Sequence, residues 1–315
     1  MNFDNKVAPE LRPILSMIPP MKLPDDLARL RQSRSKSPSQ KSDDVLTTSR
    51  LISGADGREI PVNIYEPTKK NQDQLPAVLW MHGGGFVFGL SPVDDGLCET
   101  LVKTADCVVV SVDYRLAPEH PYPAAIEDCY EALLWMSEAS EELNIDLSRL
   151  AIAGQSAGGG LTAALSLMAR DKGGPAIAFQ MPLYPMIDDR HTTPSSYEIA
   201  DEVPVWNRSH SLAAWNLYLG EHATGDISPY AAPARAQNLA GLPPTYTCVG
   251  QLDPFRDETI EYVTRLAQAG VNVEFHLYPG CFHGFDVMVP TAEVSERARN
   301  GYINALAEAL NPKQE

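Results

Sequence analysis

The segment Leu150–Arg170 reads LAIAGQSAGGGLTAALSLMAR and joins an apolar run, a glycine-rich turn and a second apolar run. Leu150–Ala153 is continuously apolar, which is typical of a strand buried on both faces of a parallel sheet. Leu161–Arg170 is rich in alanine and leucine, which favours a helix. Between them the letters GQSAG at residues 154–158 match G-x-S-x-G, the motif of a nucleophile exposed at a sharp turn from a strand into a helix.

Ser156 lies at the centre of this turn and is the candidate nucleophile. A serine in a strained backbone conformation needs neighbours without a Cβ, so that strand and helix can approach each other. The alternative is a serine that only caps the helix. The overlapping letters GGGLTA at 158–163 also fit a dinucleotide-binding fingerprint, which requires an acidic residue about 20 positions further on. Residues 172–187 contain neither Asp nor Glu, so we expect these glycines to serve close helix–sheet packing.

Strand and helix patterns alternate on both sides of this segment, from about residue 46 onward. Leu46–Ile52 and Ile60–Tyr65 flank a glycine-containing turn and predict a hairpin. Apolar residues at helical spacing occur within 126–134 and 294–310. Alternation of this kind indicates an α/β sheet with right-handed crossovers. The further runs that predict strands are Ala77–Trp80, Cys107–Val112, Ala176–Leu183, Thr245–Val249 and Val271–Tyr278.

Two stretches depart from this alternation. Residues 1–45 carry prolines and short apolar segments at helical spacing, which predicts one or two short helices laid on the rest of the chain. Residues 187–241 contain no obvious strand, and an insertion of that length in a compact domain is usually functional.

A second motif, HGGG at residues 82–85, follows the strand expected at Ala77–Trp80. Consecutive glycines allow several backbone N–H groups to converge on one point, which is what an oxyanion requires. We therefore expect His82 to hold this loop rather than to act as a base. The alternative is a flexible loop with an incidental histidine.

The base and its partner are expected on loops that follow two other strands. His283 comes after Val271–Tyr278 and Asp253 comes after Thr245–Val249. Open α/β sheets place their sites at such carboxyl ends of strands. Asp257 and Asp286 are rivals to Asp253. An acidic residue at Asp257 is explained by the helix dipole, because it lies in the first turn of the expected helix. Asp286 is only three residues from His283, which makes it a less obvious choice for orienting that histidine.

Together these motifs resemble the bacterial hormone-sensitive-lipase-like (family IV) esterases of the α/β-hydrolase superfamily. The blocks that carry the resemblance are HGGGF at 82–86, DYRLAPE at 113–119, GQSAG at 154–158, DPFRD at 253–257 and HGF at 283–285. They occur in the family's order, and the chain order Ser156, Asp253, His283 is that of the α/β-hydrolases. One position departs from the family's pattern, because Gln155 stands where Asp or Thr usually precedes the serine.

The resemblance implies an α/β-hydrolase fold, with a mostly parallel eight-stranded sheet flanked by helices and a helical cap. It implies a catalytic domain of residues 46–186 and 242–315, and a cap region of residues 1–45 and 187–241. It also implies that Ser156 is the nucleophile, His283 the base and Asp253 the acid that orients it. The oxyanion hole is then formed by the amides of Gly83, Gly84 and Ala157.

We therefore expect a serine carboxylesterase that cleaves short- to medium-chain acyl esters through an acyl-enzyme, with no cofactor and no metal. An amide, carbamate or lactone hydrolase with the same triad remains an alternative, as does a non-catalytic ligand receptor on this fold. The remaining histidines show no metal-ligand spacing. Bulky residues of the cap region are expected to narrow the pocket, and these are Met17, Met21, Tyr197, Trp206 and Trp215.

Composition limits the partners and the compartment of this chain. It has 315 residues and a net charge of −16, and its only basic run lies near residues 29–41. Nucleic acid and anionic membranes are therefore not expected as partners. Its five cysteines form no C-x-x-C pair, so we expect buried thiols rather than disulfides or zinc ligands. With no signal peptide or membrane span in the sequence, we expect a soluble, cytoplasmic protein.

The alternating pattern of Val271–Tyr278 predicts an edge strand, whose only polar residues are Asn272, Glu274 and His276. Exposed edges must be paired, covered or charged. A homodimer formed through the edge strand 271–278 is therefore expected, with a covered edge in a monomer as the alternative.

Overall fold

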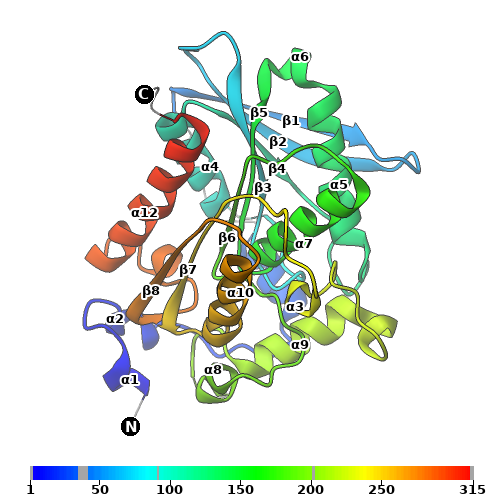
Figure 1. Ribbon diagram of the computed structural model, residues 1–315. Coiled ribbons are helices and arrows are strands. Elements are labelled where there is room, and N and C mark those ends of the chain that lie inside the picture. The colour runs from blue at the N-terminus through cyan, green and yellow to red at the C-terminus, as the bar shows by residue number, and fades with distance from the viewer. Residues whose placement is uncertain (1–2, 35–41, 91, 201–202, 313–315) are drawn as a thin grey trace.

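A single mixed sheet runs through the centre of the molecule (Figure 1). The computed structural model describes residues 3–34, 42–90, 92–200 and 203–312. Within them eight strands have the spatial order β1-β2-β4-β3-β5-β6-β7-β8. The strands are β1 (Val45–Ser53), β2 (Glu59–Pro67), β3 (Leu75–Met81), β4 (Val108–Val112), β5 (Ile145–Gln155), β6 (Phe179–Leu183), β7 (Thr245–Leu252) and β8 (Val273–Phe282). β1 and β2 form the expected hairpin, β2 is antiparallel to β4, and all other pairs are parallel.

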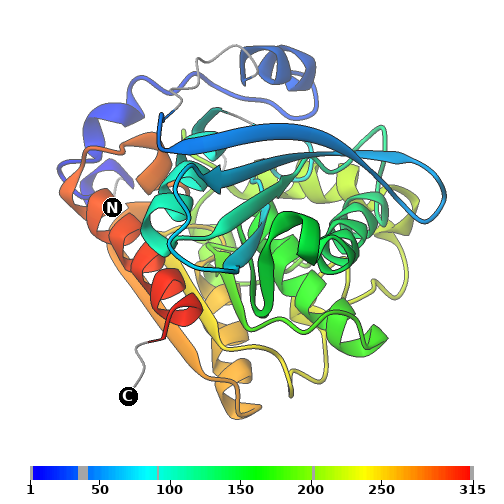
Figure 2. The same ribbon diagram turned by 90° about the horizontal axis from the view of Figure 1, so that it is seen from above.

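Helices cover both faces of the sheet, which confirms the expected fold (Figure 2). In β3 every residue is buried, and alternate side chains belong to two different apolar clusters. Val78 and Trp80 pack with the cluster of α4 and α12, whereas Leu79 and Met81 pack with that of α5 and α7. The helices are α1 (Phe3–Lys6), α2 (Arg12–Leu15), α3 (Leu27–Arg34), α4 (Pro92–Ala105), α5 (Ala124–Glu138), α6 (Ser140–Leu143), α7 (Ala157–Lys172), α8 (Pro194–Glu198), α9 (Arg208–Leu219), α10 (Arg256–Gln268), α11 (Phe285–Met288) and α12 (Glu293–Leu310), with short 3₁₀ turns at Gly220–Ala223 and Pro233–Arg235.

Most strands extend a few residues beyond the expected runs, β5 most of all, because it covers Ile145–Gln155. Two others differ in a way that the structure explains. β6 begins at Phe179 rather than Ala176, because the chain after Pro175 first crosses to β5, where the Ala178 amide donates to the Leu150 carbonyl. β8 is an edge strand, as expected, but it continues to Phe282 through a register shift opposite the end of β7. Its apolar face is also less covered than the alternation suggests, since Leu277 is 40% exposed.

The segments outside the regular alternation gather at one end of the sheet. Figure 1 shows α1, α2, α3, α8 and α9 at the end where β7 and β8 terminate. The N-terminal segment therefore has three short helices rather than one or two. Part of the basic run, residues 35–41, lies outside the described residues. No helix in the described ranges is long and apolar enough to cross a membrane.

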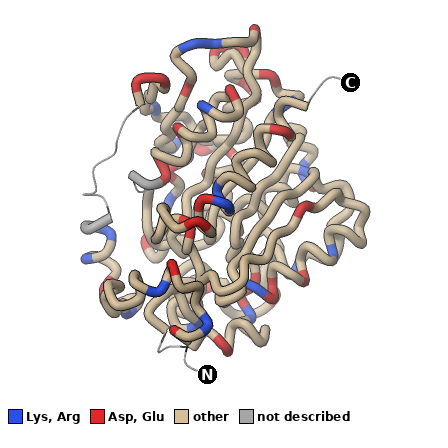
Figure 3. Tube along the Cα trace, turned by 90° about the vertical axis from the view of Figure 1, so that its left-hand side faces the viewer, with Lys and Arg blue, Asp and Glu red and all other residues tan. Residues whose placement is uncertain are grey.

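Charge and thiol chemistry are distributed as the composition indicates. Figure 3 shows acidic and basic residues scattered along the trace on the side that it presents. All five cysteines are buried with free thiols, as expected, and they are Cys98, Cys107, Cys129, Cys248 and Cys281. Burial raises the thiol pKa in each case, for Cys281 to about 12.

Candidate active site

Ser156 occupies the turn between β5 and α7 with φ 57° and ψ −117°. A conformation with this positive φ is uncommon for a residue with a Cβ and stores strain of about 1–3 kcal/mol. Backbone hydrogen bonds hold the turn, because the Ser156 amide donates to the Leu183 carbonyl and the Ser156 carbonyl accepts from the Met186 amide. Ser156 is 8% exposed and follows β5 directly, at the sheet's carboxyl end.

Glycines beside the serine allow the close approach of helix and sheet, as expected. A Cβ on Gly158 would lie 2.0 Å from the Met81 carbonyl oxygen, and one on Gly160 would lie 2.2 Å from that of Met186. Gly154 faces the same restriction from Met81 on the strand side. The GGG run therefore serves packing, in agreement with the rejection of a dinucleotide site.

His283 and Asp253 come together with Ser156 in one hydrogen-bonded series. Ser156 Oγ lies 2.8 Å from His283 Nε2, and His283 Nδ1 lies 2.7 Å from Asp253 Oδ2. Because a carboxylate oxygen can only accept, Nδ1 carries the proton and Nε2 can take the serine proton. Asp253 is fully buried and follows β7 directly, while His283 follows β8 directly. The parallel strands thus bring together three residues that are far apart in the chain.

The imidazole is held between two aromatic rings. Phe255 contacts it edge-on at 5.0 Å between ring centroids, and Tyr184 contacts it edge-on at 5.2 Å. The Phe255 amide also donates to Asp253 Oδ1 at 2.9 Å. Each oxygen of the Asp253 carboxyl group therefore has its own partner, which fixes its plane.

The rivals of Asp253 have other partners. Asp257 accepts hydrogen bonds from Arg256 and from the Ser195 amide. Asp286 is buried on α11 and accepts from the Tyr302 hydroxyl at 3.2 Å. The hydrogen-bonded series from the serine thus runs through Asp253.

The HGGG loop lies beside the serine. A Cβ on Gly83 would lie 3.4 Å from that of Ser156, and Gly84 adopts φ +127° at the point where the loop turns. Ala157 is the first residue of α7, and the first amides of a helix have no acceptor within it. Gly83 and Ala157 therefore both lie next to Ser156.

His82 is buried beneath this loop. Its ring stacks on Tyr114 at 4.1 Å, and the Tyr114 hydroxyl donates to the His82 carbonyl at 2.7 Å. The His82 Nε2 atom lies 3.9 Å from Asp113. These contacts agree with a residue that holds the loop and not with a base at the serine.

A cavity of about 400 Å³ opens above Ser156 and His283. The N-terminal segment, the 187–241 insertion and the loop after β8 each contribute part of its mainly apolar wall. The apolar side chains of this wall are Ile18, Pro19, Met21, Leu30, Phe88, Pro204, Val205, Trp206, Val287 and Met288.

Only two of the five bulky residues expected at the pocket line it, namely Met21 and Trp206. Met17 and Tyr197 are 73% and 59% exposed, and Trp215 is buried in the core. Sequence reasoning missed Phe88, Val287 and Met288 as wall residues. Phe88 could have been found from its place three residues after the HGGG motif. Val287 and Met288 lie on α11, a helix of four residues that is too short to show an apolar period.

Gln155 joins a buried polar group next to Ser156. Its Nε2 donates to Asp94 Oδ1 at 3.0 Å, and its Oε1 accepts from the Tyr184 hydroxyl at 2.9 Å. Burial and the nearby Asp286 raise the pKa of Tyr184 well above its usual value, so the phenol keeps its proton and remains a donor. The amide thus supplies one donor and one acceptor in fixed directions.

A serine on the elbow after β5, with an aspartate after β7 and a histidine after β8, defines the class of the chain as an α/β-hydrolase. Comparison with known proteins agrees with this class. Residues 78–287 match the α/β hydrolase fold family.

Named relatives cover most of the chain. Esterase LipI of Mycobacterium tuberculosis is 39% identical over 307 residues, which is 97% of this chain and 96% of the relative. The ethyl acetate hydrolase of Pseudomonas putida is 31% identical over 262 residues, 81% of this chain and 80% of the relative. The structure of a bacterial heroin esterase superposes with a TM-score of 0.92 at 41% identity, covering 98% of this chain and 100% of that one. The chain belongs to the α/β-hydrolase fold family, and its resemblance to the hormone-sensitive-lipase-like esterases is confirmed.

Proposed function

We propose that Ser156, His283 and Asp253 are the catalytic triad of this carboxylesterase. The enzyme class itself follows from the family and its named members. The observation that supports the triad is the unbroken hydrogen-bonded series from Ser156 Oγ to Asp253, which begins at an apolar cavity and ends at a buried carboxylate.

In the proposed reaction, His283 Nε2 removes the proton of Ser156 as Oγ attacks the ester carbonyl carbon. The tetrahedral intermediate collapses, the bond to the alcohol oxygen breaks, and His283 returns the proton to the leaving alcohol. Water then attacks the acyl-enzyme, with His283 again accepting and returning a proton. The products are a carboxylic acid and free Ser156.

We assign the oxyanion hole to the amides of Gly83, Gly84 and Ala157. The position of Ala157 at the start of α7 adds the positive end of a helix dipole to its N–H group. Donors fixed in this way stabilise the negative charge that develops on the carbonyl oxygen in the transition state.

The substrates we propose are esters with acyl chains of about two to eight carbons. Each methylene buried in the apolar wall favours binding by about 0.8 kcal/mol until the pocket is filled, and overpacking then reverses the trend. The wall includes residues from 1–45 and from 187–241. This supports a division into a cap of these two stretches and a catalytic domain of residues 46–186 and 242–315.

The test combines a triad variant with a substrate series. Ser156→Ala and His283→Ala are each expected to lower kcat by about 10⁶ on a chromogenic butyrate ester. His276→Ala, on the outer strand β8, is the control for His283→Ala. Retention of one tenth of wild-type activity in a clean preparation would remove Ser156 from its role. Equal or better kcat/KM on sixteen-carbon than on four-carbon esters, in detergent-matched assays, would overturn the chain-length assignment.

We further propose a twofold dimer through β8. Among the described residues β8 has no strand on its outer side, although near its end the Ala8 amide donates to the Gly280 carbonyl. The exposed Leu277 adds apolar area to the remaining edge. Light scattering at micromolar protein tests this, and a monomer mass would reject it. The cytoplasmic location and the lack of nucleic-acid binding remain predictions from the sequence.

A further inference from the structure

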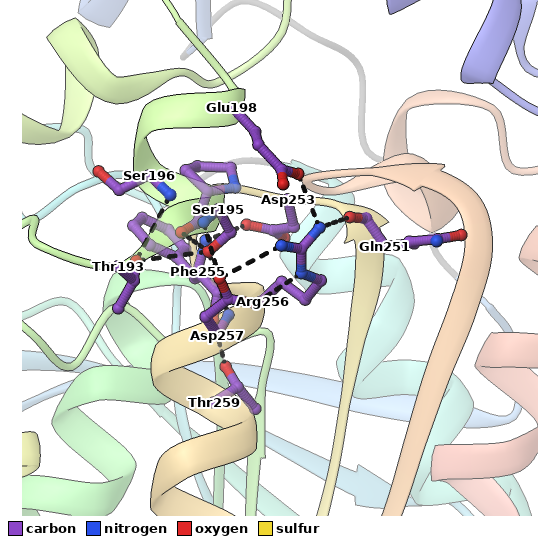
Figure 4. A network of polar contacts seen from close by, with 11 residues as sticks. Thr193, Ser195, Ser196, Glu198, Gln251, Asp253, Phe255, Arg256, Asp257 and Thr259 are labelled. Carbon is purple, nitrogen blue, oxygen red and sulfur yellow. Dashed lines mark hydrogen bonds and ion pairs between the residues drawn. The ribbon is translucent and has the colours of Figure 1, made fainter.

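A polar network connects the 187–241 insertion to the loop that carries Asp253 (Figure 4). On the insertion side lies α8, in which Ser195 is fully buried. Its Oγ donates to the Pro254 carbonyl at 2.9 Å and accepts from the Asp257 amide at 3.1 Å. Its own amide donates to Asp257 Oδ2 at 2.7 Å. Ser195 therefore contacts the residue that follows the triad acid and the start of α10.

One peptide group transmits this contact to the triad. The carbonyl of Pro254 and the amide of Phe255 belong to the same rigid, planar unit, so that rotation of one rotates the other. The carbonyl accepts from Ser195 Oγ, and the amide donates to Asp253 Oδ1 at 2.9 Å. The hydroxyl of Ser195 thus fixes the direction of the N–H group that orients the Asp253 carboxylate.

Arg256 holds the other end of α8 against the same loop. Its guanidinium donates to Glu198 at 3.0 Å, to the Gln251 carbonyl at 2.9 Å and to Asp257 at 2.7 Å. Although burial raises the pKa of Asp257, the hydrogen bonds from Arg256 and Ser195 outweigh it and lower that pKa overall. The ionised Asp257 therefore accepts from both sides and keeps α8 in register with the Asp253 loop.

We infer that Ser195 is a positioning residue for the triad acid and acts through the Pro254–Phe255 peptide. The insertion then has two roles, because one part of it forms the pocket wall and another sets the orientation of Asp253. This inference rests on the proposed triad.

The test compares Ser195→Ala with Ser196→Ala, its neighbour on α8. Ser196 is also buried, but its hydroxyl accepts from Arg208 within the insertion. Ser195→Ala is expected to lower kcat about tenfold with KM within about twofold of wild type, the effect of losing one hydrogen bond behind a catalytic group. Ser196→Ala is expected to match wild type in both. Equal kcat for the two variants would overturn the inference.

The pH profile separates positioning from a general loss of structure. A displaced carboxylate stabilises the imidazolium less, so the acidic limb of kcat/KM moves to lower pH in Ser195→Ala. The other titratable groups near the pair are not substituted in either variant, although the Asp257 amide loses its bond to the Ser195 hydroxyl in Ser195→Ala. These groups are Tyr184, Cys248, Arg256, Asp257, Glu258 and Asp286. An unchanged limb in a folded Ser195→Ala enzyme would overturn the inference.

A double-variant cycle with Asp253→Asn completes the test. Asp253→Asn alone is expected to lower kcat by about 10³–10⁴, and adding Ser195→Ala is then expected to have no further effect. A tenfold loss that persists in the Asp253→Asn background would show that Ser195 does not act through the acid. If Asp253→Asn retains wild-type activity, the proposed triad fails instead. If Ser195→Ala fails to fold, Ser195→Cys replaces it, because a thiol is a weaker donor of similar size. A kcat between those of the wild type and a tenfold-impaired enzyme would support the inference, and a wild-type kcat would overturn it.

Discussion

Replacing Gln155 with glutamate changes one NH₂ group into an oxygen while keeping the side chain's shape. In the wild type that nitrogen donates to Asp94 Oδ1 at 3.0 Å. An ionised glutamate in its place would therefore face Asp94 across about 3 Å with no proton between them, a repulsion of about 5 kcal/mol at an effective dielectric constant of about 20. A protonated glutamate avoids this repulsion, because its O–H group donates where the amide did.

The cost of keeping that proton sets the magnitude. With an unfolded pKa of about 4.3 and about 1.36 kcal/mol per pH unit, holding the proton costs about 1 kcal/mol at pH 5 and about 5 kcal/mol at pH 8. The pKa of the introduced carboxyl group is raised in the folded state, so stability relative to wild type is retained at low pH and lost as the pH rises above the unfolded pKa. For a domain of this size this corresponds to a Tm lowered by about 2 °C at pH 5 and by about 8–10 °C at pH 8.

Thermal unfolding of Gln155→Glu at several pH values measures this difference. Gln268→Glu is the matched control, because Gln268 is exposed at the end of α10 and gains the same charge in solvent. The control is expected to follow the wild type at every pH. If the Tm of Gln155→Glu is lowered by the same amount relative to wild type at pH 5 and at pH 8, the reasoning about the buried amide is wrong.

Three further substitutions test other parts of the structure. Gly158→Ala is expected to destabilise the fold by more than about 4 kcal/mol, because its Cβ would lie 2.0 Å from the Met81 carbonyl oxygen. Gly96→Ala is the control, because its Cβ would meet open space. In denaturant titrations this control should unfold at the same concentration as the wild type or at a slightly higher one. Burial raises the pKa of Glu258 well above its usual value, so the stability of the wild type falls as the pH rises. Glu258→Gln stays neutral at every pH. Its Tm should therefore exceed that of the wild type at pH 8 and not at pH 5. His82→Ala should lower the unfolding free energy by about 2–3 kcal/mol through loss of its buried contacts while retaining measurable ester hydrolysis, and complete inactivity of a folded His82→Ala protein would contradict its role as a loop holder.

The sequence predicted the elements of the sheet and the residues at their carboxyl ends because both depend on local pattern. Ser156, Asp253 and His283 each follow a strand directly, and parallel pairing then brings strand ends together whatever the distance along the chain. Contacts from segments without a period were not predictable in this way. The bond between Ser195 and Pro254 joins residues 59 apart, and it depends on the path of the insertion, which no apolar repeat specifies.

The site itself has a part held by the sheet and a part held by segments without a periodic pattern. Ser156 is held at the sheet, because its amide donates to Leu183 at the end of β6 and its carbonyl accepts from Met186 just beyond it, while the neighbouring glycines pack directly against backbone atoms. Its strained φ of 57° is therefore maintained by contacts that unfold only with the core. His283 and Asp253 lie on loops, and their geometry depends on what packs behind those loops. Substitutions in the core around Ser156 should therefore act on folding before they act on rate. Substitutions in the insertion can instead change the rate of a fully folded enzyme, because the contacts of α8 and α10 hold the loop that carries Asp253.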